Sequence, residues 1–305
     1  MKTGAVIVAA GAPSGAASFE PTRPIGSISA VRRIISTLQQ AGVDPIVLVT
    51  GNRADELGKH VSKWGVICLR NEDYEHTEMF DSAKIGLAYL AGKCDQILFT
   101  PVDIPLFTVG TVRRLIESGS RLASPTYHNR AGHPLLLSAD MIERILAYRG
   151  GGGLRAAVLE CGLPAARIPV DDAGVLFDAD APGDYRELLR EHNVQMFRPL
   201  VRVELAREEA FFGPGTAMLL RLIESTGSVR VACLLMNLSY SKSWKMINRM
   251  EREIGYPVLI RRQGGSRGGN SVLTERGRAM LEAYEQFEKE VADAAQVIFQ
   301  RRFGA

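Results

Sequence analysis

Cysteine is scarce in this sequence, and long apolar runs are missing. The 305 residues include four cysteines, Cys68, Cys94, Cys161 and Cys233, and none belongs to a C-x-x-C pair. This spacing argues against a zinc site or a disulfide framework and favours single buried thiols in the reducing cytoplasm. No apolar run reaches about 18 residues, so no membrane segment is predicted. The apolar start, residues 1–12, lacks a signal-peptide cleavage pattern and is predicted to be a buried strand.

What the sequence does have is the composition of a globular protein and an uneven charge. Apolar residues make up 46% and charged residues 23%, and the length predicts about two domains. Residues 1–197 contain 20 basic and 22 acidic side chains, whereas residues 198–305 contain 17 and 12. Nine basic and three acidic side chains fall within residues 242–278. This basic segment favours a polyanionic partner for the C-terminal part alone, although a solvated surface would carry the same charge.

Strand and helix patterns alternate over residues 1–191. Short β-branched runs predict strands at Ala5–Val8, Ile46–Val49, Val66–Leu69 and Ile97–Phe99. Amphipathic patterns predict helices at Ile28–Gln40, Arg53–Lys63, Asp81–Ala91 and Val109–Glu117. This alternation predicts an α/β domain with a Rossmann-like, mostly parallel sheet that helices cover on both faces. Ligands of such sheets bind at the carboxyl ends of the strands, where the predicted loops are Ala9–Gly26, Asn71–Phe80 and Pro101–Leu106.

The pattern changes after residue 191. Helices are predicted at Thr216–Glu224, Ser228–Met236, Ser241–Ile254 and from Thr274 to about Gln300. Short strands at Val258–Arg262 and Ser271–Leu273 flank a glycine-rich hairpin, or wing. Helices in this order, followed by a wing, predict a mainly α winged helix-turn-helix domain. The predicted organisation is an α/β domain at residues 1–192, a linker at 193–212 and the winged helix domain at 213–305.

The third helix of the second domain is the predicted recognition helix. Short donors and cations on its early turns can reach phosphates and base edges of double-stranded DNA, namely Ser241, Lys242, Ser243, Lys245 and Asn248, and Ser239 in the preceding turn is predicted to contact DNA as well. In the wing, phosphates are predicted to be neutralised by Arg261, Arg262 and Arg267. The small core is predicted to contain Leu219, Leu222, Ile223, Val231, Leu234, Leu235, Trp244, Ile247 and Met250.

Several short motifs of this domain have a characteristic order and spacing. They are Gly213-Pro214-Gly215-Thr216, Gly227-Ser228-Val229, Leu238-Ser239-Tyr240-Ser241, Gly255-Tyr256-Pro257 and Leu273-Thr274-Glu275. Over about residues 200–300 the chain resembles the N-terminal DNA-binding domain of ModE, a molybdate-responsive repressor with a LysR-like winged helix. The resemblance implies a homodimer formed through the last helix. The apolar residues available for this contact are Leu281, Tyr284, Phe287, Val291, Ala294, Val297 and Ile298.

Candidate binding residues of the α/β domain follow two of its predicted strands. The motif Ala9-Ala10-Gly11 opens a loop of small residues whose backbone N–H groups can cradle a nucleotide. Asp103 follows the strand at 97–99, and Asp178 and Asp180 form a second acidic cluster. Carboxylates from separate strand ends can hold Mg²⁺ together with phosphate oxygens. Spacing alone equally favours another interpretation, in which Asp103 and Asp180 only cap the elements that follow them.

A wider set of motifs accompanies these residues. It includes Pro24-Ile25-Gly26, Val49-Thr50-Gly51, Asn71-Glu72-Asp73-Tyr74, Pro101-Val102-Asp103-Ile104-Pro105, Gly132-His133-Pro134 and Asp178-Ala179-Asp180-Ala181-Pro182. Together they resemble the MobA/MocA-like nucleotidyltransferases, which attach a nucleotide to molybdopterin. The resemblance implies that Asp103 is the main Mg²⁺ ligand, with Asp178 or Asp180 as the second, and that the Gly11 loop binds CTP or GTP. It also implies that Gly132, His133 and Pro134 lie near the acceptor, a molybdopterin-type small molecule.

The chain departs from this family's pattern in the nucleotide loop. The family has an Arg four residues after the glycine of Ala-Ala-Gly and a Lys nine residues after it, where this chain has Gly15 and Glu20. Losing one such electrostatic group typically costs about 10²–10³ in rate. Arg23 is the nearest cation that could take the place of the missing Arg and Lys, provided that the loop shifts. A second departure is the run Gly150–Gly153, followed by Arg155, where relatives carry a charged residue within a glycine-containing stretch.

These observations favour a cytoplasmic DNA-binding regulator linked to molybdenum metabolism. Its nucleotidyltransferase-like domain is expected to bind a nucleotide or a molybdenum-cofactor ligand and to have lost most or all catalysis. The alternative is an active Mg²⁺-dependent molybdopterin cytidylyltransferase-type enzyme fused to its own regulatory domain. A third hypothesis gives the α/β domain a role in assembly alone.

Overall fold

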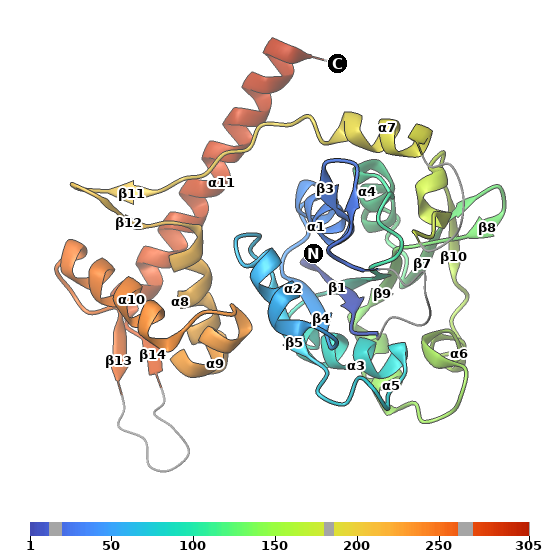
Figure 1. Cartoon of the computed structure of the whole chain (residues 1–305), viewed down its shortest axis with the longest axis horizontal. Helices are drawn as coiled ribbons and strands as arrows, with labels where there is room; N and C mark the ends of the chain where they lie inside the picture. Colours follow the sequence, from blue (N-terminus) through green and yellow to red (C-terminus); the bar gives the residue numbers. More distant parts are fainter. Residues whose placement is uncertain (12–19, 180–185, 262–270, 305) are drawn as a thin grey trace. The chain divides into compact units, whose positions relative to one another are not determined.

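The chain folds into two compact units, Met1–Met196 and Phe197–Ala305 (Figure 1). The computed structural model describes residues 1–11, 20–179, 186–261 and 271–304. Residues Gly15, Asp180, Arg262 and Arg267, which the sequence analysis singled out, lie outside these ranges. In the part of the chain that is described, no helix has both the length and the apolar character needed to cross a bilayer.

A mixed sheet of eight strands runs through the N-terminal unit in the order β10-β7-β9-β6-β1-β4-β5, with β8 paired to β7. Strand β9 runs antiparallel to both of its neighbours, and the other pairs on this path are parallel. The prediction of a mostly parallel sheet is confirmed. The strands are β1 (Thr3–Ala9), β4 (Ile46–Thr50), β5 (Ile67–Arg70), β6 (Gln96–Pro101), β7 (Leu122–Tyr127), β8 (Arg130–Ala131), β9 (Leu135–Ser138) and β10 (Ala166–Pro169).

Helices cover both faces of this sheet because each has one apolar stripe to bury. One large core contains apolar side chains of the sheet and of α1 (Ala30–Gln40), α2 (Ala54–Val61), α4 (Val109–Glu117) and the short 3-10 helix η1 (Ala173–Leu176). Three helices that contact one another cover the opposite face, namely α3 (Met79–Leu90), α5 (Ala139–Ala147) and α6 (Gly153–Glu160). The predicted helix boundaries differ from these by two residues or fewer at most ends.

The last helix of the unit, α7 (Arg186–Gln195), completes a second, smaller core. Its Leu188 and Leu189 pack against Ile25 of the hairpin formed by β2 (Pro24–Ile25) and β3 (Ile28–Ser29), and against Leu106 after β6. Phe177 and Ala179 belong to the same cluster, so α7 contacts segments that come from three separate parts of the chain.

The C-terminal unit is built on helices and two small hairpins. Its elements are β11 (Leu205–Ala206), β12 (Ala210–Phe212), α8 (Pro214–Thr226), α9 (Val229–Leu235), α10 (Tyr240–Ile254), β13 (Leu259–Arg261), β14 (Ser271–Leu273) and α11 (Glu275–Phe303). The β11–β12 hairpin lies within the segment that the sequence analysis took as a linker. It is part of the unit's core, because Phe212 is buried against Tyr284 of α11, with ring centroids 4.8 Å apart.

Two residues predicted for this small core lie on the surface instead. Val231 and Leu234 of α9 are 41% and 69% exposed, whereas Ala232 and Cys233 of the same helix are buried. The inner face of α9 is instead formed by Val229, Ala232, Cys233 and Leu235, of which Leu235 was predicted.

Candidate functional site

The motif Ala9-Ala10-Gly11 lies at the centre of the strand edge where ligands are expected. Strand β1 pairs with both β4 and β6, and Ala9 and Ala10 are buried while Gly11 is exposed. The carbonyl of Ala10 accepts a hydrogen bond from the amide of Asn52, 3.3 Å away. Gly51 precedes Asn52, and a Cβ added at Gly51 would lie 2.6 Å from Cβ of Tyr74. Glycine is therefore required where the loops after β1, β4 and β5 come together.

Asp103 and Asp178 are brought together by a backbone contact. The amide of Ala179 donates a hydrogen bond of 2.8 Å to the carbonyl of Asp103, and both aspartates are half-buried. Among the described residues no cluster of three or more His, Cys, Asp or Glu is arranged to hold a metal ion. Two carboxylates would supply the hard oxygen ligands that Mg²⁺ takes and would leave its other positions to phosphate and water, so the chemistry of this pair suits the predicted ion.

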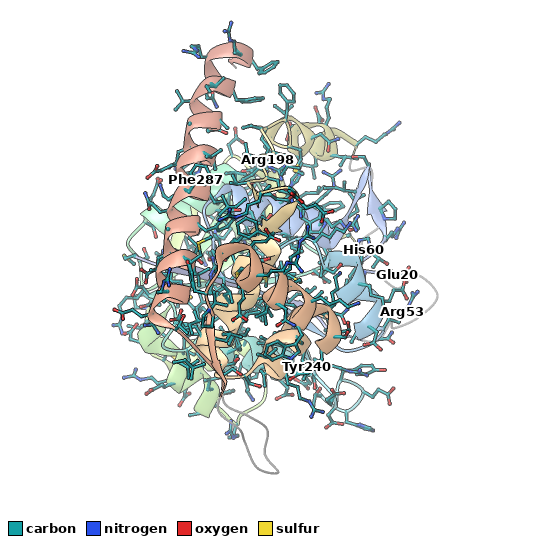
Figure 2. All side chains as sticks on the ribbon, turned by 90° about the vertical axis from the view of Figure 1, so that its left-hand side faces the viewer. Glu20, Arg53, His60, Arg198, Tyr240 and Phe287 are labelled. Carbon is teal, nitrogen blue, oxygen red and sulfur yellow. The ribbon has the colours of Figure 1, made fainter. Side chains whose placement is uncertain are left out.

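Glu20, for which the resemblance predicts a lysine, is held by a cation from another loop. It forms an ion pair with Arg53, and Figure 2 labels both side chains, which point toward each other. Arg53 also pairs with Glu56 at 2.6 Å. The amide of Arg23 donates to the carbonyl of Glu20, and its side chain is exposed. Nothing in the sequence signalled the pairing of Glu20 with Arg53, because 33 residues separate them.

The segment Gly132-His133-Pro134 lies between β8 and β9, and Gly132 and His133 border a cavity of about 730 Å³. The amide of His133 donates to the carbonyl of Val175 at 3.0 Å. Pro134 is buried, and a Cβ at Gly132 would lie 2.8 Å from the carbonyl carbon of Val175. Burial lowers the pKa of His133, so its ring is neutral at pH 7. The sequence did not reveal that Ser124, Arg155 and Arg167 border the same cavity.

A second polar cluster that the sequence did not reveal joins α7 to α1. The guanidinium of Arg33 is fully buried and donates to the carbonyl of Ile25 at 2.6 Å and to Oδ1 of Asn193 at 2.9 Å. Its Nη1 also lies 3.1 Å from Nδ1 of His192, whose Nε2 lies 3.3 Å from Oγ1 of Thr37. A buried cation is thus shared between the hairpin that follows the nucleotide loop and the last helix of the unit.

In the C-terminal unit, α10 has one buried and one exposed side. Ser243, Ile247 and Met250 are fully buried, whereas the exposed residues on its early turns are Tyr240, Ser241, Lys242, Lys245 and Asn248. Ser239 precedes the helix and caps it, accepting a hydrogen bond of 3.3 Å from the amide of Lys242.

Ser243 does not fit the predicted DNA-contacting set, because its hydroxyl faces inward and donates to the carbonyl of Ser239 at 3.3 Å. The turn before α10 passes through Asn237, whose φ of 50° lies in the left-handed region that asparagine tolerates. Strand β13 ends at Arg261, paired with Ser271 of β14, at the base of the predicted wing.

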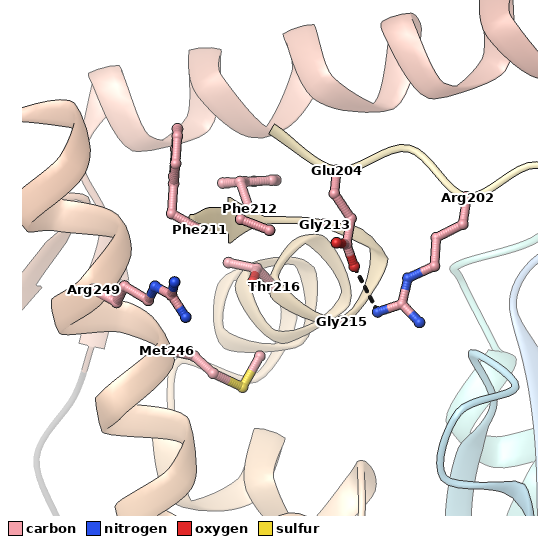
Figure 3. Close-up of a pocket in the computed structure, with 10 residues that line it drawn as sticks. Arg202, Glu204, Phe211, Phe212, Gly213, Gly215, Thr216, Met246 and Arg249 are labelled. Carbon is pink, nitrogen blue, oxygen red and sulfur yellow. Dashed lines mark ion pairs between the residues drawn. The ribbon is translucent and has the colours of Figure 1, made fainter. Parts of the chain in front are cut away.

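A smaller cavity of about 170 Å³ lies beside the beginning of α8 (Figure 3). Arg202 and Arg249 border it, and each is paired with a glutamate: Arg202 with Glu204 at 2.8 Å and Arg249 with Glu209. Because both cations are already paired, their contacts here serve the packing of the β11–β12 hairpin.

A family model for the MobA-like NTP transferase domain matches residues 5–165, which is more than half of the chain. The chain belongs to this family. The matched residues contain most of β1, the strands β2 to β9 and the helices α1 to α6, together with Asp103 and His133. The match ends before Asp178 and before α7.

The C-terminal region matches curated relatives of a second kind. The molybdenum-pterin-binding protein MopB of Rhodobacter capsulatus is 36% identical over 90 residues, 30% of this chain and 33% of MopB. The molybdenum transport protein ModE of Azotobacter vinelandii is 33% identical over 103 residues, 32% of this chain and 38% of ModE. The DNA-binding transcriptional dual regulator ModE of Escherichia coli K12 is 29% identical over 79 residues. The chain thus spans about a third of the length of these relatives.

Solved structures share the fold of the MobA-like domain. A nucleotidyl transferase from Methanothermobacter thermautotroptrophicus superposes with a TM-score of 0.53 at 22% identity, over 64% of this chain and 98% of that one. Rv0371C from Mycobacterium tuberculosis H37Rv, solved as a complex with manganese, gives a TM-score of 0.51 at 23% identity, over 62% of this chain and 98% of that one. These likenesses establish a nucleotidyltransferase fold.

Proposed function

We propose that this chain is a DNA-binding regulator linked to molybdenum metabolism, whose MobA-like domain binds a nucleotide or a molybdenum-cofactor species that biases DNA binding. The observation that carries the proposal is the two-sided recognition helix α10. Its buried side holds Ser243, Ile247 and Met250, and its exposed side presents Ser241, Lys242 and Lys245. A helix anchored in this way can enter a major groove with its cations toward phosphates. The likeness of this region to ModE proteins supports the same role.

The test of DNA binding is its salt dependence. Each phosphate that a lysine neutralises contributes about 0.9 to the slope of log affinity against log salt. Replacing both Lys242 and Lys245 by Ala should lower the measured slope by about two. The readout is fluorescence anisotropy of a labelled duplex between low and physiological salt. Lys289→Ala is the matched control, because Lys289 is an exposed cation on α11 that pairs with Asp293. An unchanged slope in the double variant, or an equal loss in the control, would contradict the assignment of α10.

The proposed ligand of the MobA-like domain is a nucleotide with Mg²⁺. Asp103 and Asp178 would hold the ion, and the first residues after β1 would offer backbone N–H groups to the phosphates. Bound Mg²⁺ supplies positive charge to the phosphate oxygens, which matters in a loop where Glu20 replaces a lysine. The ion pair of Glu20 with Arg53 supports binding in spite of this replacement, because it offsets the negative charge of the carboxylate.

The small core beneath α7 is the proposed link between ligand and DNA binding. It contains Ile25, next to the nucleotide loop, and Phe177 and Ala179, on either side of Asp178. Leu188 and Leu189 of α7 close this core, and the second unit begins at Phe197. A ligand that orders these segments would change the stability of α7. It can shift DNA affinity only if it binds the DNA-bound and the DNA-free protein with different affinities.

The test of sensing is DNA affinity with and without Mg²⁺ and CTP or GTP, in wild type and in Asp103→Asn. A shift in wild type that Asp103→Asn abolishes supports the proposal. Equal affinities with and without every nucleotide would remove the sensing role and leave the DNA-binding role standing.

The second candidate is an active nucleotidyltransferase, favoured by the contact that holds Asp103 beside Asp178. The discriminating measurement is pyrophosphate release from CTP or GTP in the presence of molybdopterin. Turnover in wild type that Asp103→Ala abolishes would establish the enzyme. Calorimetry that shows no heat with any Mg²⁺–nucleotide mixture would instead favour an assembly role.

A further inference from the structure

The recognition helix α10 carries two aromatic residues, Tyr240 and Trp244, that the predicted DNA contacts leave unused. We call them the aromatic flank. Tyr240 is the first residue of α10 and is 54% exposed (Figure 2), whereas Trp244 is half-buried. Their rings pack edge to face, with centroids 6.0 Å apart and an interplanar angle of 77°. This contact limits the orientations that are open to the exposed ring of Tyr240.

The aromatic flank lies along one edge of the exposed side of α10. Residues four apart stand one above the other on a helix, so the two rings form a continuous surface. About 3.6 residues per turn place Ser241 and Lys245 along the middle of the exposed side and Lys242 at its opposite edge. The helix therefore presents cations in the middle and at one edge, and an apolar ring at the other edge.

The segment around Tyr240 carries charge of one sign. Residues 228–250, which include α9 and most of α10, contain no acidic residue and four basic ones, namely Arg230, Lys242, Lys245 and Arg249. An exposed aromatic ring among cations suits a partner that combines negative charge with apolar groups. The major groove of DNA is such a surface, because phosphates line its walls and base edges form its floor.

The place of Tyr240 in the helix directs its ring toward those base edges. The N-terminal residues of a recognition helix are the ones that contact bases. Every Cα–Cβ bond of a helix tilts toward the N-terminus, so the side chain of the first residue projects past the beginning of the helix. The hydroxyl of Ser239 turns back to accept a hydrogen bond from the amide of Lys242, which leaves the space ahead of α10 to the tyrosine.

One base presents an apolar group in the major groove. This group is the 5-methyl group of thymine, whereas the other bases are distinguished there by their hydrogen-bond donors and acceptors. We infer that Tyr240 determines sequence choice by packing its ring against the 5-methyl group of a thymine. The inference rests on the proposed function, because it requires that α10 enters the major groove.

Replacement of thymine by deoxyuridine tests the inference, because it removes the methyl group and keeps the hydrogen-bonding atoms. The probe is a duplex that the full chain enriches from a random-sequence library, remade with deoxyuridine at one thymine at a time. Fluorescence anisotropy gives the affinity for each thymine duplex and for its deoxyuridine counterpart. With wild type, at least one replacement should weaken binding about fourfold, which corresponds to the burial of one methyl group.

Tyr240→Ala should abolish this difference, so that the thymine duplex and the deoxyuridine duplex bind with equal affinity. Tyr240→Phe keeps the ring and should keep the difference. Leu234→Ala is the matched control and should also keep it, because Leu234 is an exposed apolar residue of α9, outside the recognition helix. Partial unfolding of a variant does not change the ratio of the two affinities, and Tyr240→Ser gives the same readout if Tyr240→Ala unfolds completely.

A difference that persists in Tyr240→Ala at every affected thymine would overturn the inference, as would equal affinities of wild type for all the duplexes. The experiment also separates this inference from the proposed function. Enrichment of a duplex in which no methyl group matters removes the role of Tyr240 and leaves α10 as the DNA-binding element. Failure of the full chain to bind any duplex removes both. A lower affinity of the Lys242 and Lys245 double variant with an unchanged ratio supports both.

Discussion

His192 should make the N-terminal unit lose stability as the pH falls below neutral. Its ring is almost fully buried, and burial together with the neighbouring guanidinium of Arg33 lowers its pKa from 6.5 to about 3. A hydrogen bond with the backbone of Phe107 acts in the opposite direction without offsetting this. The folded unit therefore keeps the ring neutral over a pH range in which the unfolded chain would protonate it.

The magnitude follows from proton linkage. Because the folded pKa is the lower one, the unfolded state binds more protons between pH 6.5 and about 3, and stability falls as the pH drops through this window. One pKa unit corresponds to about 1.4 kcal/mol. From pH 7 to pH 5 the unit should therefore lose about 2 kcal/mol through His192, on the order of a quarter of the stability of a typical domain.

The two tryptophans make the measurement selective. Trp64 lies in the N-terminal unit and Trp244 in the C-terminal unit. In a Trp244→Phe background, urea unfolding followed by tryptophan fluorescence reports on the N-terminal unit alone. His192→Gln keeps an acceptor for Arg33 but does not titrate. The loss in free energy of unfolding between pH 7 and pH 5 should therefore be about 2 kcal/mol smaller in this variant than in wild type. His76→Gln, at an exposed position, is the control and should follow wild type. If His192→Gln and wild type lose the same amount, the buried Arg33–His192 contact does not control the titration.

Three further predictions concern the same unit. Arg33→Met should lower the free energy of unfolding of this unit by about 3–5 kcal/mol in the same urea assay, because it leaves the buried carbonyl of Ile25 and the Asn193 side chain without a donor. Arg113→Met, which removes one exposed hydrogen bond, is the control and should cost about 1 kcal/mol or less. Gly51→Ala should destabilise by roughly 1–3 kcal/mol and weaken Mg²⁺–nucleotide binding measured by calorimetry, since its Cβ would overlap Tyr74 and force the loops apart. Glu20→Lys should tighten triphosphate binding at low salt by about threefold or more, and an unchanged affinity would mean that position 20 does not face the phosphates.

The regular parts of both units were predictable because local patterns determine them. Continuous apolar strands between amphipathic helices predicted the parallel sheet, and the predicted strand at Ser271–Leu273 matches β14. Ser228, Ser239 and Thr274 precede helices, and each accepts a hydrogen bond from an amide in the first turn of the helix that it caps. In such segments the sequence within one turn is enough to decide the structure.

Orientation of a short helix was harder to predict. α9 has seven residues, too few for helical spacing to distinguish its faces, and the larger side chains Val231 and Leu234 point outward. Ser243 illustrates the same difficulty, because serine fits a DNA-facing surface and also a tightly packed inner face where its hydroxyl bonds to the preceding turn.

Long-range pairing could not be predicted at all. The cavity beside α6 depends on the register of β7, β9 and β10, and only that register places Ser124 and Arg167 with His133. The ion pair of Glu20 with Arg53 and the contacts of Arg33 with α7 likewise join residues far apart in the sequence. The sequence therefore showed that Glu20 is acidic, but it did not show that Arg53 offsets this charge in the folded protein.

The packing of α7 bears on how this domain can be produced by itself. The family match stops at residue 165, yet Ile25 and Leu106 are covered by leucines of α7, and the guanidinium of Arg33 is shared with His192 and Asn193. A fragment cut at the family boundary would expose an apolar patch and leave a desolvated positive charge without those partners. A fragment that keeps these contacts accordingly extends to Met196, thirty-one residues past the end of the family match.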